Sequence, residues 1–419
     1  VVAEEGGIPP LVELLKDEAV GPHENATRAL WHLSTTRENQ LAIAAEGCLP
    51  PLVANLSAEL DRAKWAAAAL KALSTDCSEN QLALARVGAI PQLAVLLGSE
   101  SDETQLYAQG ALLNIAVPQE SRTAVVNSLV SLLEVRNAAA QMKAAESLAL
   151  LAARSAENRT VIAQAGAIMP LVRLLGDGRN VSTSQVHAAA ALGDLARSGE
   201  SKQAIVQAGG VGPFVAMLLS HGEEAQTRAA IAVCHLAAST SAQQLIADAD
   251  GIIHLVKLLS GSNLTAATHA AGALWHLESL ASTKAVIVSA GGIAALVDLL
   301  GRIEGVEGAS GQDAIAALLA DLARERGSAK ASIVHRGGIP HLVHLLEKGS
   351  PVAQKHASCA IWGLTTEPVY QKAVIEAGAV PFLVKLLSDQ KAQGYAAAAL
   401  NNLAHDAGAR SKLMECGVV

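Results

Sequence analysis

The sequence predicts an all-α protein, an α-solenoid of about ten repeated units with three helices in each unit. Two observations lead to this prediction. A segment of the form Gly-x-Ile-Pro-x-Leu-Val-x-Leu-Leu recurs along the chain, and most successive copies start 41 to 43 residues apart, which is a helical-repeat spacing. Hydrophobic residues make up 51% of the chain but aromatic residues only 2%. Ala, Leu, Val and Ile must therefore fill the core, and a chain this apolar is not intrinsically disordered.

The recurring segment begins at a glycine in almost every copy. GGIPPLVELL at Gly6 returns as GCLPPLVANL at Gly47 and as GGIPHLVHLL at Gly337. The other copies start at Gly88, Gly166, Gly209, Asp250, Gly291 and Gly378, and a degenerate copy, NSLVSLLEV, starts at Asn127. We interpret residues 1–419 as a single solenoid whose first and last repeats are incomplete, with an irregular repeat at about 117–153.

Each repeat is expected to contain three helices in a fixed order. A short first helix ends on glycine, as in residues 39–47, where glycine suits a left-handed C-terminal cap. Proline follows two or three residues later, where we expect it at the first position of the second helix. Nine of the thirteen prolines lie at this joint. The second helix carries LVxLL, and a longer third helix of small and aliphatic residues follows, which lets neighbouring helices pack closely.

Two stretches depart from this pattern. The glycine–proline joint is missing from 117 to 135, which predicts merged or truncated helices and a change in superhelical direction. Residues 301–312 (GRIEGVEGASGQ) lengthen one repeat and predict a loop between helices, since no GxxxxGK[ST] motif indicates a phosphate site. The chain also begins and ends inside a repeat, so we expect it to be part of a larger chain or assembly.

Charge and composition argue against two classes of function. Lys and Arg number 31 against 39 Asp and Glu, and a general nucleic-acid binder needs an excess of basic residues to replace phosphate counterions. We therefore expect no nucleic-acid partner. No apolar run approaches the ~18 residues of a membrane-spanning helix, so we expect no membrane insertion.

The sequence also lacks the signs of a cofactor, a metal or a catalytic site. The five cysteines share no CxxC or CxxH spacing, which argues against a structural metal site and against a disulfide framework. We found no GxSxG, HExxH, dinucleotide or phosphate-loop motif, so we expect no enzymatic activity and no cofactor. Reduced thiols favour a cytoplasmic protein, with the nucleus and the cytoskeleton as alternatives.

With these motifs in place, the chain resembles the armadillo-repeat proteins. The resemblance rests on the Gly-x-Ile-Pro-x-Leu-Val-x-Leu-Leu segment followed by Ala-Leu-x-Asn-Leu-Ala, best seen at 113–116 and 401–404, and it covers essentially the whole chain. It implies a right-handed solenoid whose third helices line a concave groove. In this family, extended partner peptides usually lie in that groove.

The resemblance implies two rows of groove candidates on the third helices. The row that matches the family Asn contains Asn114 and Asn402, and elsewhere His32, Asp194, His235, His276 and Asp321. An Asn side chain both donates and accepts hydrogen bonds, so it can hold a peptide backbone. Seven residues earlier, the second row contains Trp65, Tyr107, Lys143, His187, Arg228, His269, His356 and Tyr395. The basic members of these rows favour acidic or phosphorylated side chains.

Trp31, Trp275 and Trp362 stand one residue before the family Asn position. We interpret them as packing between adjacent third helices and not as ligand anchors. None of the residues four positions before the family Asn is Trp, whereas the nuclear-import adaptors carry Trp there. An importin-like cargo adaptor is therefore disfavoured.

These features predict a non-enzymatic scaffold or adaptor that binds partner proteins or extended peptides along its groove. The alternative is a substrate-binding or autoinhibitory segment of a larger enzyme, because armadillo arrays accompany U-box ubiquitin ligases and some TIR proteins. The identity of the partner is left open by the sequence.

Overall fold

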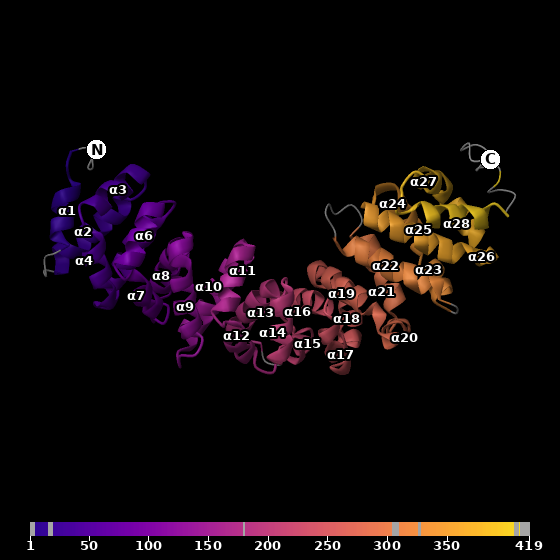
Figure 1. Ribbon diagram of the computed structural model, residues 1–419, viewed down its shortest axis with the longest axis horizontal. Helices are drawn as coiled ribbons and strands as arrows, with labels where there is room; N and C mark the ends of the chain where they lie inside the picture. Colours follow the sequence, from indigo (N-terminus) through magenta and orange to yellow (C-terminus); the bar gives the residue numbers. More distant parts are fainter. Residues whose placement is uncertain are drawn as a thin grey trace. The chain divides into compact units, whose positions relative to one another are not determined.

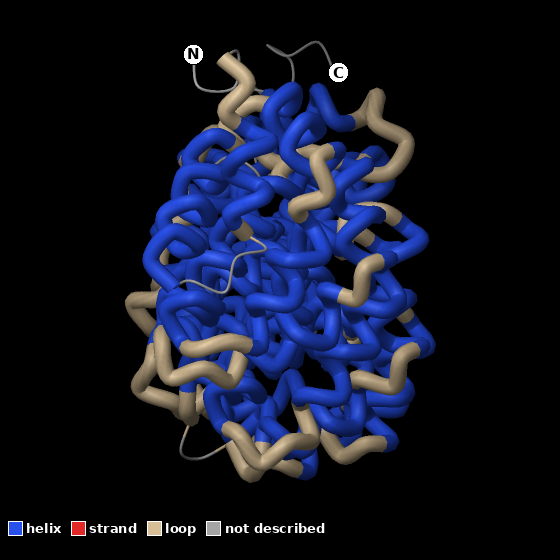
Figure 2. Tube along the Cα trace, turned by 90° about the vertical axis from the view of Figure 1, so that its left-hand side faces the viewer, coloured by secondary structure: helices blue, strands red, loops and turns tan. Residues whose placement is uncertain are grey.

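The computed structural model describes residues 5–15, 20–178, 181–303, 310–325, 328–405 and 410. Within these residues all regular elements are helices (Figures 1 and 2). The structure divides into two compact units, Val1–Gly176 with Val181–Ala208 and Asp177–Asn180 with Gly209–Val419. Residues 304–309 of the loop predicted at 301–312, and both chain ends, lie outside the described residues.

The first unit contains the helices drawn from indigo to magenta in Figure 1. Its third helices are α2 (Val20–Leu33), α5 (Leu60–Ser74), α8 (Asp102–Ile115), α10 (Ala138–Arg154) and α13 (Thr183–Leu195). The shorter helices are α1 (Ile8–Leu14), α3 (Arg37–Ala45), α4 (Leu49–Ala54), η1 (Asn55–Ser57), α6 (Ser78–Arg86), α7 (Ala89–Leu96), α9 (Gln119–Leu132), α11 (Ala156–Gln164), α12 (Ile168–Leu175) and α14 (Gly199–Gln207).

The second unit repeats the same order of helices. Its third helices are α16 (Glu223–Ala237), α19 (Leu264–His276), α22 (Ser310–Arg324), α25 (Pro351–Thr365) and α28 (Gln393–Leu403). The others are α15 (Val211–Met217), α17 (Thr240–Asp248), α18 (Gly251–Leu259), η2 (Leu277–Ser279), α20 (Ala281–Ser289), α21 (Gly292–Arg302), α23 (Ser328–His335), α24 (Gly338–Lys348), α26 (Pro368–Glu376) and α27 (Ala379–Leu386). The predicted all-α fold with three helices per repeat is confirmed.

The joint between the first and second helices has the predicted left-handed backbone. Gly47 and Gly88 have φ angles of 81° and 79°, and Asp250, which takes the place of the joint glycine in its copy, has a φ angle of 61°. The joint prolines lie in the first turn of the second helix, but at its second or third position and not at the first. Pro91, for example, is the third residue of α7. The N–H groups of a first turn have no partner inside the helix, so proline is tolerated throughout it.

One helix, α9, stands where the glycine–proline joint is missing from the sequence. It contacts α7, α10 and α11, and so takes the place that two short helices fill in other repeats. Without the joint glycine and proline, nothing in residues 119–132 interrupts the helix. The degenerate repeat therefore has two helices.

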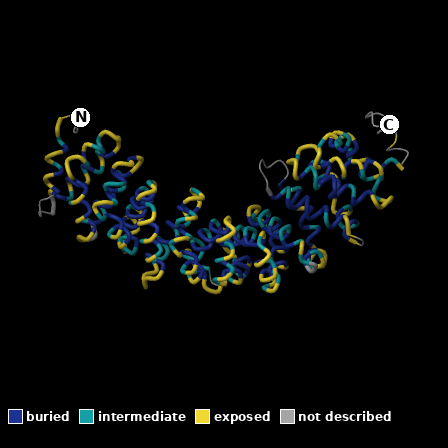
Figure 3. The backbone as a smooth tube through the Cα atoms, in the orientation of Figure 1, coloured by how far each residue is buried: buried dark blue, intermediate teal, exposed yellow. Residues whose placement is uncertain are grey.

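Third helices of successive repeats pack closely because small residues face one another. Ala66, Ala67 and Ala69 of α5 are fully buried. A methyl group added at Gly363 in α25 would lie 2.7 Å from the carbonyl oxygen of Ala323 in α22. Figure 3 shows buried residues along the packed sides of the helices in each unit and exposed residues at their outer turns. Backbone spacing in the stack is therefore set by Ala and Gly.

Buried polar side chains bind the C-terminal carbonyl groups of the third helices. Nε2 of Gln40 in α3 donates to the oxygens of Ser34 and Ala72, at 3.3 and 2.9 Å. Nδ2 of Asn80 in α6 donates to the oxygen of Leu73 at 2.8 Å. The last carbonyls of a helix have no partner inside it, so these bonds satisfy them and attach each third helix to the next repeat.

Within the described residues, no single helix is long and apolar enough to cross a membrane. The segments Thr283–Ser289 and Gly292–Arg302, bent by 81°, meet the length and composition requirement only when taken together.

Candidate peptide-binding face of the third helices

All fifteen predicted groove residues lie on third helices. In the first unit they are His32 on α2, Trp65 on α5, Tyr107 and Asn114 on α8, Lys143 on α10, and His187 and Asp194 on α13. In the second unit they are Arg228 and His235 on α16, His269 and His276 on α19, Asp321 on α22, His356 on α25, and Tyr395 and Asn402 on α28. His32 is exposed and the others are half-buried. We call the surface that carries them the third-helix face and describe it within each unit.

Aromatic rings from three successive third helices meet in the first unit. The ring of Trp31 in α2 lies 5.5 Å from that of Trp65 in α5 and 6.2 Å from that of Tyr107 in α8. His32 lies 4.5 Å from Trp31. The structure therefore brings His32, Trp65 and Tyr107 together around Trp31, which the sequence predicted only as packing between helices.

Cationic side chains stack on this aromatic cluster. The guanidinium carbon of Arg28 lies 4.7 Å from the ring centre of Trp65, and Nζ of Lys64 lies 4.8 Å from the same centre. Nζ of Lys71 lies 5.6 Å from the ring centre of Tyr107. A cation at such a distance from an aromatic face is attracted to its π electrons. Arg28, Lys64 and Lys71 are not among the predicted site residues. Their sequence spacing from the aromatic row does not by itself indicate that they contact these rings.

The two family-type asparagines turn their amide groups toward the preceding third helix. Nδ2 of Asn114 donates to the oxygen of Lys71 and to the hydroxyls of Ser74 and Thr75, each at 3.2 Å. Nδ2 of Asn402 donates to Thr365 Oγ1 at 3.3 Å. The donor end of Asn114 is thus engaged within the protein, and its carbonyl oxygen is the end that can serve a ligand.

Charged candidates on α10 and α13 are paired with neighbours on their own helix. Nζ of Lys143 lies 2.9 Å from a carboxylate oxygen of Glu146, and Asp194 lies 3.9 Å from Arg197. Burial acts to raise the pKa of Glu146, but hydrogen bonds from Lys143 and Gln109 and the nearby positive charge hold it below its usual value. Lys143 is therefore partly neutralised, unlike Arg28 and Lys71, for which no ion pair is found within the described residues.

In the second unit, Trp275 of α19 connects two predicted residues. Its ring stacks on that of His276 at 5.6 Å and meets that of His356 in α25 edge-on at 6.0 Å. Burial and the neighbouring Lys355 lower the pKa of His356, against the opposing effect of Asp321 and Asp313. The ring of Trp362 lies 5.9 Å from that of Tyr395. Trp31, Trp275 and Trp362 thus all contact rings on other third helices.

Asp321 has a carboxyl neighbour that sequence reasoning missed. Glu278, on the turn η2 after α19, lies beside it, while Arg324 lies 3.7 Å from Asp321 on the other side. Burial and the Asp321 carboxylate raise the pKa of Glu278 to about 8, and Lys284 acts weakly against this. Oε2 of Glu278 is buried without a hydrogen-bond partner among the described residues. Glu278 lies two residues after the family Asn position, in a turn with no sequence signature.

The remaining predicted residues make local contacts. Arg228 lies 3.4 Å from Glu224, one turn earlier on α16. Nδ1 of His269 donates to the carbonyl oxygen of Thr265 at 2.8 Å. His187 of α13 lies close enough to Glu146 of α10 to help lower the pKa of that carboxyl, and His235 lies on α16.

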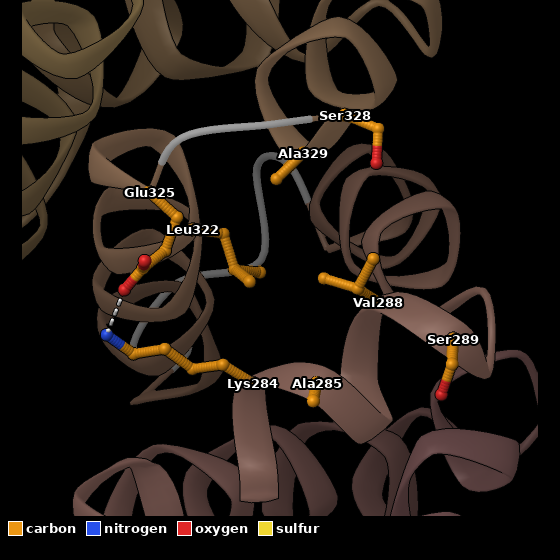
Figure 4. Close-up of a pocket in the computed structure, with 8 residues that line it drawn as sticks. All are labelled: Lys284, Ala285, Val288, Ser289, Leu322, Glu325, Ser328 and Ala329. Atoms are coloured by element: carbon orange, nitrogen blue, oxygen red, sulfur yellow. Dashed lines mark hydrogen bonds and ion pairs between the residues drawn. The ribbon is translucent and has the colours of Figure 1, made fainter. Parts of the chain in front are cut away.

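Three surface pockets lie away from all fifteen predicted residues. One of about 430 Å³ lies between α20, α22 and α23, with Val288, Leu322 and Ala329 in its wall (Figure 4). An ion pair of 2.9 Å between Lys284 and Glu325 borders it. Pockets of about 460 and 390 Å³ lie beside Pro170 and Leu219. In the part of the chain that the structure describes, no group of three or more His, Cys, Asp or Glu side chains could hold a metal ion.

Comparisons with known proteins agree with this fold. Residues 124–391 match the family model "Plant U-box protein ARM repeat region", and residues 1–35 and 77–117 match "Armadillo/beta-catenin-like repeat". A search of curated proteins found no significant match.

Two solved structures are similar over most of the chain. The crystal structure of an engineered protein is 33% identical with a TM-score of 0.72, over 94% of this chain and 98% of the other. A structure from work on a phosphorylation switch in the interaction between cadherin and β-catenin is 19% identical with a TM-score of 0.66, over 96% of this chain and 83% of the other. The second likeness shows the fold alone.

Proposed function

This chain belongs to the family of plant U-box protein ARM repeat regions, and we propose that it is a non-enzymatic interaction module that holds a partner protein or an extended peptide along its third-helix face. Armadillo repeats are generally protein-interaction scaffolds. The partner, and the face that binds it, are the parts that we propose.

The ring cluster of Trp31, Trp65 and Tyr107 is the observation that best supports the proposal. In a chain with four Trp and three Tyr, three of these side chains meet on one face and remain half-buried. Trp and Tyr contribute large contact area at little entropic cost and are enriched where proteins bind proteins. A fully enclosed core position would hide such rings, whereas this face leaves part of each one open to a ligand.

Small residues beside the rings support a ligand in an extended conformation. Four residues before the family Asn position, Gly110 and Gly272 are covered by the side chains of Lys71 and Cys234, which lie 2.8 and 2.9 Å from where a Cβ would be. Ala190 and Ala398, at the same position in other repeats, are half-buried. Without bulky side chains there, a ligand backbone can approach the helices closely.

Peptide display with a proteome-derived library tests the proposal. We expect enriched peptides to lose binding to a Trp65→Ala variant or to a Tyr395→Ala/Asn402→Ala variant. The control is Val95→Ala/Val369→Ala, which removes two apolar side chains that are 72% and 74% exposed on α7 and α26. Peptides that bind the third-helix variants as well as the wild type, or that depend on the control residues, would show that this face is not the binding surface.

A second candidate function is the substrate-binding region of a U-box ubiquitin ligase. The family match over residues 124–391 favours it, because the matched family consists of such repeat regions. The test is to read the complete transcript for a U-box in the same open reading frame. If one is present, partners found by display should be ubiquitinated by the full protein in vitro, and their modification should fail in the Trp65→Ala variant. An open reading frame without a U-box rules this candidate out.

A further inference from the structure

The face formed by α2, α5 and α8 carries positive charge that the protein itself does not neutralise. Arg28 is exposed and Lys71 is half-buried. In the described part of the chain, no carboxylate lies within ion-pair distance of either side chain, whereas Lys64 lies 3.1 Å from Asp61 and 3.7 Å from Glu103. Two of the three cations on this face are thus available to an acidic ligand.

Each of these two cations is held in place by a ring from the next repeat. Arg28 of α2 lies over Trp65 of α5, and Lys71 of α5 lies over Tyr107 of α8. Stacking on a ring uses the π face of the aromatic side chain and leaves the N–H groups of the cation free to donate. A side chain that is already positioned loses less entropy when a ligand binds, so these two cations are well prepared to hold an anion.

We propose that the α2–α5–α8 face binds an extended acidic segment of a partner protein, with one carboxylate or phosphate group on Arg28 and another on Lys71. The inference rests on the proposed function and specifies the chemistry of the ligand. A charge-assisted hydrogen bond from Arg or Lys to an anionic oxygen is about twice as strong as a neutral one, so two of them select acidic over neutral side chains.

The positions of the two cations define a spacing for the acidic groups. Neighbouring helices lie ~8–10 Å apart. Lys71 stands one residue before the family Asn position and Arg28 four residues before it, which adds about 4.5 Å along the helix axis at 1.5 Å per residue. The resulting separation of about 10 Å equals three residues of a polyproline II chain, whose residues i and i+3 point the same way. We therefore expect acidic residues three positions apart.

The acid-binding part of the face ends at α10. Lys143 occupies the position that Trp65 and Tyr107 hold in earlier repeats, and it is paired with Glu146 at 2.9 Å. With no ring to stack a cation and with its own charge partly neutralised, this repeat does not continue the pattern. Recognition of acidic residues is thus confined to the first three third helices.

Fluorescence anisotropy with short labelled peptides of Ser, Ala and Pro tests this inference. One peptide carries Glu at every third position, a second carries phosphoserine there, and a third carries Gln. We expect the Glu and phosphoserine peptides to bind and the Gln peptide not to bind. Comparing the affinities of the Glu and phosphoserine peptides shows whether a carboxylate or a phosphate group is preferred.

Charge reversal locates the binding. Arg28→Glu/Lys71→Glu should weaken binding of the acidic peptides on the order of ten- to a hundred-fold, because two attractive contacts become repulsive. The control is Arg86→Glu/Arg136→Glu, the same charge change at two exposed positions of the same unit. If the reversal variant fails to fold, judged by thermal unfolding, Arg28→Gln/Lys71→Gln replaces it and should give a smaller loss in the same direction.

Several results would overturn the inference. They are failure of both acidic peptides to bind, equal binding of the Gln peptide, equal loss in the control variant, or stronger binding of a single-stranded oligonucleotide of the same charge. The display experiment separates these failures from failure of the proposed function. If displayed peptides depend on the third-helix face but carry no acidic residues, the proposed function stands and the acidic-ligand inference falls.

Discussion

The carboxyl groups of Glu278 and Asp321 lie side by side in the second unit, one on the turn after α19 and the other on α22. Glu278 is partly buried, and its pKa is raised to about 8 by this burial and by the Asp321 carboxylate. The pair therefore carries a proton at neutral pH. Since Asp321 is one of the predicted groove residues, the proton lies on the third-helix face.

This pair predicts a pH dependence of stability. The pKa of Glu278 is higher in the folded state than its ordinary value of 4.5, so its protonated form stabilises the fold. That contribution is complete below about pH 4.5 and is lost as the pH rises through about 8. A Glu278→Gln variant keeps a neutral group there, and we expect it to be more stable than the wild type at about pH 9 by roughly 1 kcal/mol, a value reduced for the partial exposure of the site.

Urea unfolding of both proteins at about pH 5 and about pH 9 measures this difference. Glu376→Gln, a substitution of an exposed glutamate on α26, is the control and should leave the pH dependence unchanged. A Glu278→Gln variant that shows the wild-type loss of stability at high pH would contradict the prediction.

Packing of α25 against α22 predicts a loss of stability on adding one methyl group. Gly363→Ala places a carbon 2.7 Å from the carbonyl oxygen of Ala323, so the two helices must separate. We expect a loss of about 1–3 kcal/mol, the range for overpacked cores. Gly394→Ala in α28 is the matched control, since nothing lies within 4 Å of the added carbon there, and it should not destabilise the protein. Equal stability of the two variants would argue against this close approach.

Hydrogen bonding by the two asparagines predicts unequal effects of the same substitution. Asn114 donates to three acceptors on the preceding repeat and Asn402 to one. Asn114→Ala should cost about 1–2 kcal/mol and Asn402→Ala about half as much, because more acceptors on the preceding repeat lose their partner. Thermal unfolding of the two variants compares them directly. A larger loss of stability for Asn402→Ala than for Asn114→Ala would contradict this prediction.

Backbone strain at one joint predicts a stabilising substitution. Asp250 holds a left-handed conformation with φ of 61°, where the other joints have glycine. Asp250→Gly should raise the free energy of unfolding by about 0.5–1 kcal/mol, because glycine adopts this conformation without steric cost. The reverse test is Gly291→Ala, with φ of 76° and no neighbour near the added carbon, which should destabilise the fold by about 1 kcal/mol. A lower denaturation midpoint for Asp250→Gly together with a higher one for Gly291→Ala would rule out backbone strain as the cause.

Features that depend on residues close together in the sequence were predictable from the sequence alone. Joints at residues such as Gly47 and Gly88, the order of three helices, and the position of every candidate on a third helix all follow from local backbone preferences and from a repeat of about 41 residues. The merged helix α9 follows in the same way from the missing joint. Even so, local preference did not resolve whether a joint proline stands at the first or the third position of its helix, since the whole first turn tolerates it.

Only the tertiary structure decided the contacts between different repeats. Arg28 stacks on Trp65, Asn114 turns its amide toward Lys71, and Glu278 meets Asp321, each pair lying 37 to 43 residues apart in the sequence. Such contacts depend on the angle and spacing at which adjacent third helices pack, and small residues such as Gly363 set that spacing. The repeat pattern therefore determined which residues lie on the third-helix face, whereas helix packing determined which of them are free, paired or protonated there.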